Sequence, residues 1–225
     1  MPNTIDSPIM DVRLLGKGAV SGLMAGTNEI YVRYWKYSYE GAGTFSLALP
    51  KWVNSYGVIM SGGGGGGRAG SGFNNDIGHG GTGGRVRAIW GKTAFSPGRV
   101  LRGTIGAGGA GGASSHANGQ NGGNTAFTSL TSTEYIAEGG TAYPSSGEQD
   151  GGTTSQMIIS PYHKYFDTPP DMAYHNGPGG KGDGGAGSNG GGGAGGNGGI
   201  LNRYTHGGKG GDGFVHIHLW GLHRD

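Results

Sequence analysis

The chain lacks cysteine, lacks long apolar runs and carries few charges over its 225 residues. Without thiols it can form neither a disulfide framework nor a thiolate metal site. No stretch approaches the roughly 18 consecutive apolar residues of a membrane span, and no basic segment followed by an apolar one suggests a secretory signal. We therefore expect no membrane span, and a protein of this kind that works outside a cell would need another exit route, such as lysis.

Charge gives no sign of a polyanionic partner. The formal net charge is +2, charged residues make up 13% of the chain, and the positive ones are scattered. Nucleic-acid-binding domains usually carry a basic patch or stripe instead. We expect no nucleic-acid partner.

Glycine is present in excess, at 57 of 225 residues, against roughly 7% in average proteins. The strongest pattern lies in residues 177–199, where glycine recurs at every third position: Gly184, Gly187, Gly190, Gly193, Gly196 and Gly199. A period of three is typical of polyproline-II geometry, which has about three residues per turn and a rise of ~3.1 Å. These structural glycines would then line one edge of a single rod roughly 50 Å long.

Related glycine runs occur at 62–67, 78–84, 103–112 and 207–213. A rod of this type makes no hydrogen bonds to itself, so buried rods must pair with one another. Glycine edges would allow the close approach that backbone and Cα–H···O contacts need. We interpret the pattern as a bundle of polyglycine-II-like rods.

Two other interpretations fit the glycine runs less well. A flexible linker would behave as a random coil, but these runs recur and are flanked by strand-like segments rather than by separate domains. A collagen-like helix needs abundant proline, and Pro178 is the only proline within residues 177–199.

Short apolar segments between the glycine runs predict strands. They fall within 11–35, on either side of a turn at Pro50 in 45–60, and at 85–90, 99–105, 126–137 and 214–220. The expected fold class is mostly β, with short antiparallel strands framing the rods. We divide the chain into an N-terminal, strand-rich attachment segment (1–40) and a glycine-rich domain (41–225).

Residues 153–176 form an insert that is poor in glycine and rich in aromatic side chains. Aromatic residues with polar handles supply contact area at low entropic cost and suit stacking on sugar rings. The receptor-binding candidates are Tyr143, Tyr162, His163, Tyr165, Phe166 and Tyr174. Alternatively, these side chains cover the rod ends or fill a subunit interface.

Motifs for catalysis or cofactors are weak. Residues 106–111 match the GxGxxG dinucleotide fingerprint, which requires a following helix, but 113–123, ASSHANGQNGG, cannot form one. His216 and His218 share one face of the last strand, where imidazoles from three subunits would bind a metal at a threefold axis; we favour a half-exposed strand face without metal. With no carboxylate pair or Ser/His/Asp order, we expect no enzyme and no cofactor.

The segment Leu49-Pro50-Lys51-Trp52 before the run Gly62–Gly67, then GRVRAIW, RVLRGTIGAGGAGG and the closing GGKGGDGFVHIHLW, resembles the glycine-rich domain of actinobacteriophage minor tail proteins. The resemblance covers about residues 11–221, and polyglycine-II bundles also occur in phage adhesin tips. The aromatic insert departs from the family pattern, so the resemblance assigns no role to the surface that the insert forms.

The resemblance implies a bacteriophage virion protein, a minor tail protein that is made in the host cytoplasm and assembles as a homotrimer with other tail proteins. The expected role is host adhesion at the tail tip, where loops would contact a cell-surface glycan or glycolipid. One alternative is a purely structural virion protein without host contact. Another is a cell-wall glycan depolymerase, against which the missing carboxylate pair argues.

Overall fold

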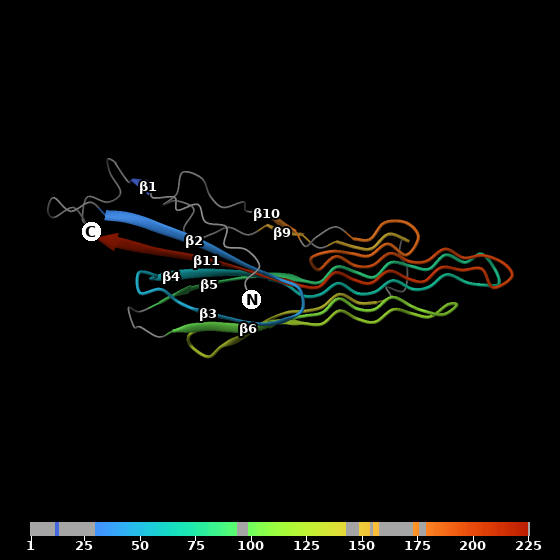
Figure 1. Cartoon of the computed structure of the whole chain (residues 1–225), viewed down its shortest axis with the longest axis horizontal. Coiled ribbons are helices and arrows are strands. Elements are labelled where there is room, and N and C mark those ends of the chain that lie inside the picture. The colour runs from blue at the N-terminus through green and yellow to red at the C-terminus, as the bar shows by residue number, and fades with distance from the viewer. Residues whose placement is uncertain are drawn as a thin grey trace.

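The computed structural model describes residues 12–13, 30–93, 99–142, 149–153, 155–157, 173–175 and 179–224. Within these ranges the chain forms strands and extended rods, without a helix. Figure 1 shows the two parts in line, with the rods leaving the strands along the long axis. The prediction of a mostly β fold with short antiparallel strands is confirmed.

The larger sheet is organised around β11 (Phe214–Arg224), which lies between β2 (Ile30–Glu40) and β4 (Ser55–Ser61). With β1 (Val12–Arg13) and β5 (Val86–Lys92) at its edges, the strand order is β1-β2-β11-β4-β5. Every pair is antiparallel. The strand predicted at 214–220 is therefore confirmed, and it continues to Arg224.

The pairing of β2 with β11 joins the two ends of the described chain. The register runs from Phe214 opposite Glu40 to Arg224 opposite Ile30. Residues 30–40 are thus part of the same sheet as the glycine-rich part of the chain. An attachment role for residues 1–40 stays a prediction.

The smaller sheet has the order β3-β6-β7-β8 and is antiparallel throughout. Its strands are β3 (Gly43–Ala48), β6 (Val100–Ile105), β7 (Thr125–Thr128) and β8 (Glu134–Ala137). Two short strands, β9 (Ser155–Met157) and β10 (Ala173–His175), form a separate antiparallel pair.

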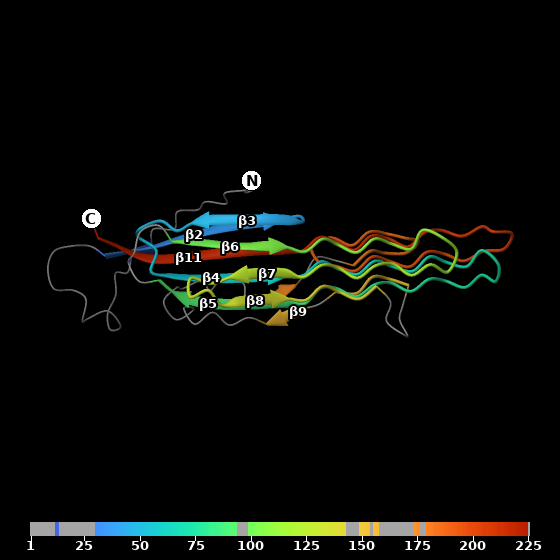
Figure 2. The same ribbon diagram turned by 90° about the horizontal axis from the view of Figure 1, so that it is seen from below.

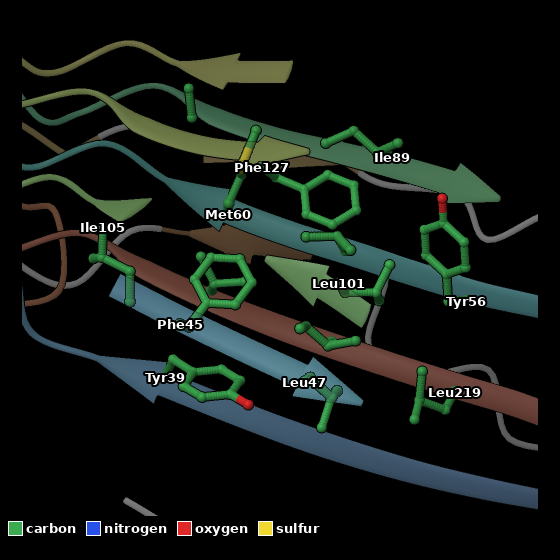
Figure 3. Close-up of a cluster of buried hydrophobic side chains, with 14 of the residues drawn as sticks. Tyr39, Phe45, Leu47, Tyr56, Met60, Ile89, Leu101, Ile105, Phe127 and Leu219 are labelled. Carbon is green, nitrogen blue, oxygen red and sulfur yellow. The ribbon is translucent and has the colours of Figure 1, made fainter. Parts of the chain in front are cut away.

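The two larger sheets enclose an apolar core, drawn in Figure 3. Period-two alternation along β11 directs Val215, Ile217 and Leu219 into it, and all three are completely buried. The smaller sheet contributes Phe45 and Phe127 from the other side. Burying each such side chain stabilises the fold by about 1.5–3 kcal/mol, so this core holds the base from which the rods leave.

The rods extend from one end of the strands, along the strand direction (Figures 1 and 2). The rod that follows β4, residues 62–72, is the central rod. It donates backbone hydrogen bonds to rods 76–85, 117–123 and 205–211, and it accepts them from 109–116, 140 and 193–199. Three successive N–H groups point to three different rods, because Gly65, Gly66 and Gly67 donate to the carbonyls of Thr82, Gln120 and Gly208, each at 2.9 Å. Every third N–H group of the central rod therefore donates to the same neighbouring rod, as the three residues per turn of polyglycine-II geometry require.

Glycine is needed along the central rod because the neighbouring backbones occupy the space of any side chain. A Cβ on Gly67 would overlap the carbonyl group of Ala194, which is backbone and cannot rotate away. This close packing of main chain takes the place of a side-chain core in the rods.

The period-three glycines do not form one continuous rod, so that prediction is wrong. The chain reverses at Asn189 and Gly190, which both have positive φ (41° and 85°), and the N–H of Gly191 donates to the carbonyl of Ser188 at 2.7 Å. Asn-Gly suits such a turn because both residues tolerate positive φ. The rod of 191–199, here called the second inner rod, runs beside the central rod, whereas 184–188 lies on its other side.

Side chains at the rim bind backbone amides that face no further rod. Asn121 and Asn124 accept hydrogen bonds through Oδ1 from the N–H groups of Ala142 (2.8 Å) and Gly139 (2.9 Å). Asp212 accepts from the N–H of Gly108 at 2.8 Å. These caps satisfy donors that lack a rod neighbour, much as capping side chains do at helix ends.

Candidate functional site

Most of the receptor-binding candidates fall outside the described residues: Tyr143, Tyr162, His163, Tyr165 and Phe166. Tyr174 lies on β10, where its backbone pairs with Gln156 of β9. Binding by these residues stays a prediction.

His216 and His218 lie on the face of β11 opposite the core, between the aromatic rings of Phe214 and Trp220. The imidazole of His216 is 4.7 Å from the ring of Phe214, and that of His218 stacks at 5.8 Å on Trp220. His216 Nδ1 also lies 2.9 Å from Ser38 Oγ. His216 is half-buried, but His218 is only 1% exposed, so the expected half-exposed setting is wrong for His218.

The surroundings of the two histidines favour neutral imidazole. Burial, with Lys36 as a smaller cause, lowers the pKa of His216 to about 4 and that of His218 to about 3. A ring enclosed within its own chain, as His218 is, cannot converge with copies on a threefold axis. Among the described residues no group of three or more metal-ligating side chains occurs.

The six period-three glycines occupy three different settings. Gly193, Gly196 and Gly199 lie on the second inner rod and donate hydrogen bonds to carbonyls of the central rod at 2.8–2.9 Å. Gly184 and Gly187 lie on the adjacent rod, and Gly190 lies in the turn between the two. Their environment is therefore backbone packing.

Three loops meet at the end of the rods that lies furthest from the sheets. We call residues 71–77, 113–116 and 199–204 the distal tip; its first and last loops reach furthest in Figures 1 and 2. The N–H of Asn202 donates to the carbonyl of Gly72 at 2.7 Å, and the N–H of Gly72 donates to Ser115 Oγ at 2.9 Å. The loops thus form one connected surface.

The distal tip exposes large apolar side chains. Leu201 is 84% exposed, Phe73 74%, Ile200 57% and Ile77 51%. The other large apolar side chain with comparable exposure in the described part of the chain is Ile136 at 39%, on β8. Exposed apolar residues that gather at one place mark interaction sites more often than residues scattered singly.

Leu201 also has an unfavourable backbone conformation. It and Asn202 have φ of 56° and 57°, and the N–H of Arg203 donates to the carbonyl of Ile200 at 3.2 Å across them. A turn with two positive φ angles favours Asn-Gly, which this chain uses at 189–190. A non-glycine residue at positive φ is uncommon unless it is Asn, Asp or His, and such backbone strain is concentrated at functional sites.

Polar side chains lie on the same loops as the apolar ones or next to them in the sequence. Arg203 is exposed, and the ring of Tyr204 lies 6.0 Å from that of His206. Asp76 accepts a hydrogen bond from Asn74 Nδ2 at 2.6 Å and lies 3.8 Å from His116 Nε2. The distal tip therefore carries both exposed apolar side chains and polar or charged ones.

Sequence reasoning missed the distal tip. Its apolar residues interrupt two glycine runs in the short pieces GFNNDIG and GGILNRY, which read as ordinary loops. The available signal was the presence of Leu and Ile where a turn between rods needs only Asn and Gly.

No helix in the described part of the chain is long and apolar enough to cross a membrane. A comparison with curated proteins finds no match. The glycine-rich domain family matches residues 40–220, which include all the described rods and most of both sheets. The chain therefore belongs to the glycine-rich domain family.

Proposed function

We propose that the protein is a minor tail protein at the tip of a bacteriophage tail, where it presents loops to the host surface. The observation that carries the proposal is the placement of exposed apolar residues, one of them (Leu201) with a strained backbone, at the far end of a rigid rod bundle. The sheets at the other end supply the base, and residues 1–40 would attach it to other tail proteins. The resemblance to actinobacteriophage tail proteins supports this role.

Rigidity supports a presenting role because it fixes the tip relative to the base. The central rod hydrogen-bonds to neighbours on every side, and residues 190–196 of the second inner rod and its turn are all buried. Local motion needs exposed, loosely bonded backbone, which these rods lack. A loop on such a rod would meet its target without the entropic cost of ordering the support.

Immunogold electron microscopy of virions of the encoding phage tests the location. Antibodies raised against the purified chain should label the tail tip. Label confined to the capsid, or no label on intact and disrupted virions, would contradict the proposal. The mass of the purified protein in solution, measured alongside, tests the homotrimer that the resemblance implies.

Co-sedimentation of the purified protein with host cells tests the host contact. Binding is expected, and it should be reduced by substitution of exposed residues at the distal tip or of the aromatic residues of the insert 153–176. Tail-tip label without any cell binding would favour the purely structural alternative. Release of reducing sugar from host envelopes by the wild-type protein would instead favour a depolymerase.

A further inference from the structure

We propose that the distal tip binds a lipid surface with anionic headgroups by inserting Phe73, Ile77, Ile200 and Leu201 into its apolar layer. The inference deepens the proposed host contact and rests on it for its biological setting. The proposed partner is a lipid bilayer, whereas the resemblance implies a cell-surface glycan or glycolipid.

The apolar side chains carry the first step. Ile77, Ile200 and Leu201 are aliphatic and are between 51% and 84% exposed. Aliphatic side chains present no hydrogen-bonding group to a sugar hydroxyl and no flat ring for stacking, so they gain most by leaving water for an apolar phase. Phe73, 74% exposed, adds an aromatic ring to the same end.

The backbone of the distal tip is already hydrogen-bonded within the tip. The N–H of Phe73 donates to Ser71 Oγ at 3.1 Å, and that of Asn75 donates to the carbonyl of Gly199 at 3.3 Å. The turn at Leu201 is closed by the bond from Arg203 to Ile200. Unpaired peptide groups oppose entry into lipid, and these bonds reduce that penalty.

The exposed Arg203 beside the apolar turn favours an anionic headgroup. Two arginines, Arg68 and Arg203, and two acids, Asp76 and Asp183, lie on or beside residues 68–79, 113–118 and 199–206, since Asp183 accepts a hydrogen bond from the Thr205 hydroxyl. Asp76 is engaged with Asn74 and lies near His116, whereas Arg203 is exposed directly after the apolar turn. Arginine beside lipid phosphate strengthens surface binding, and Tyr204 matches the aromatic residues found at membrane interfaces.

The backbone conformation at Leu201 is the independent observation. An Asn-Gly turn would join the two rods without strain, as at 189–190. The chain instead places leucine at φ 56° with 84% of its surface in water. Both the positive φ and the exposure to water are unfavourable for leucine, and insertion into an apolar layer would remove the second of these costs.

Vesicle flotation tests the proposal with vesicles of phosphatidylglycerol and phosphatidylcholine. The full chain should float with mixed vesicles, and Leu201→Ser should weaken partitioning about tenfold, the scale of losing one buried leucine. Ile136→Ser is the matched control, since Ile136 is also exposed but lies on β8, and it should bind like wild type. Arg203→Gln should weaken binding to mixed vesicles and leave the weaker binding to pure phosphatidylcholine unchanged.

Circular dichroism should show both serine variants folded, because the substituted side chains are exposed. Absence of wild-type flotation would overturn the proposal, as would equal losses in Leu201→Ser and Ile136→Ser. Host-cell binding that persists in Leu201→Ser would overturn the lipid proposal, and so would binding that disappears when the cells are treated with protease. Either result would indicate another receptor and leave the host-binding role intact. Vesicle binding by a protein absent from virions would instead contradict the tail-tip role and leave the lipid site.

Discussion

The carbonyl of Ala194 occupies the position where a side chain on Gly67 would begin. Gly67 belongs to the central rod and Ala194 to the second inner rod, so the contact joins the two most enclosed backbones of the bundle. Neither can withdraw, because the N–H of Gly67 is bonded to Gly208 and that of Ala194 to Gly185.

We therefore expect Gly67→Ala to destabilise the protein by about 3 kcal/mol, the upper end of the usual penalty for overpacking. Gly152→Ala is the matched control, because the atom nearest to its Cβ would be Thr82 Cα at 3.3 Å, and the nearest carbonyl oxygen, that of Gly81, would be 3.5 Å away. Urea denaturation of both variants measures the difference. Equal midpoints would show that the rods adjust easily.

Acid should weaken the fold through His216 and His218, which lie next to each other on one face of β11. Their pKa values in the folded protein, about 4 for His216 and about 3 for His218, lie below the ordinary 6.5. Unfolding then takes up protons below pH 6.5, so the stability present at neutral pH falls as the pH drops from 6.5 toward 4. Each histidine contributes a slope of about 1.4 kcal/mol per pH unit.

Denaturation at pH 7 and pH 4.5 tests this expectation. The free energy of unfolding should be about 5 kcal/mol lower at pH 4.5, as the sum for the two histidines. In His216→Gln the loss should be roughly half as large. His206→Gln, at an exposed position, should leave the pH dependence unchanged. A wild-type protein equally stable at both pH values would contradict the buried neutral state.

Asp212 should contribute as a cap between rod and sheet. Burial would raise its pKa, but hydrogen bonds from the Gly108 N–H and from Lys209 outweigh it and lower the pKa below its ordinary value. Its stabilisation is therefore present near neutral pH and lost as the pH falls below about 3.8. We expect Asp212→Asn to cost about 1 kcal/mol at pH 7, measured by thermal unfolding.

The comparison variant for Asp212→Asn is Asp76→Asn, whose carboxylate is exposed at the distal tip. It should change stability by less than about 0.5 kcal/mol. A larger loss in Asp76→Asn than in Asp212→Asn would argue against the capping role.

Leu201→Gly should stabilise the protein, because glycine adopts φ 56° without steric penalty. The expected gain is about 0.5–1 kcal/mol in the free energy of unfolding. Asn202→Gly, at the neighbouring positive φ, should gain less because asparagine already tolerates this region. A loss of stability in Leu201→Gly would mean that the leucine supports the turn.

Periodicity in the sequence predicted the rods and most of the strands, because both depend on local repetition. It failed at Asn189-Gly190, where glycine continues in phase through a turn and only the Asn-Gly pair signals the reversal. It also did not show that β5 and β6, consecutive in the chain, enter different sheets. Such pairing depends on contacts between residues far apart in sequence.

The candidate site was less predictable than the fold. Aromatic content directed attention to 153–176, whereas the distal tip depends on three loops that meet only once the rods are aligned. Burial of His218 likewise could not be read from alternation along one strand, which shows that two residues share a face but not what covers that face.

The threefold hydrogen-bond pattern of the central rod restricts how such a chain can change in length during evolution. Inserting one residue would turn every later position by about 120° and exchange its neighbours, whereas inserting three would restore the pattern one turn, or about 9 Å, further along. Insertion of three residues at matching positions in adjoining rods would lengthen the rod bundle, and the loops of the distal tip could change in length independently. Insertions and deletions among related chains should therefore occur in multiples of three within the rods and in any number at the distal tip.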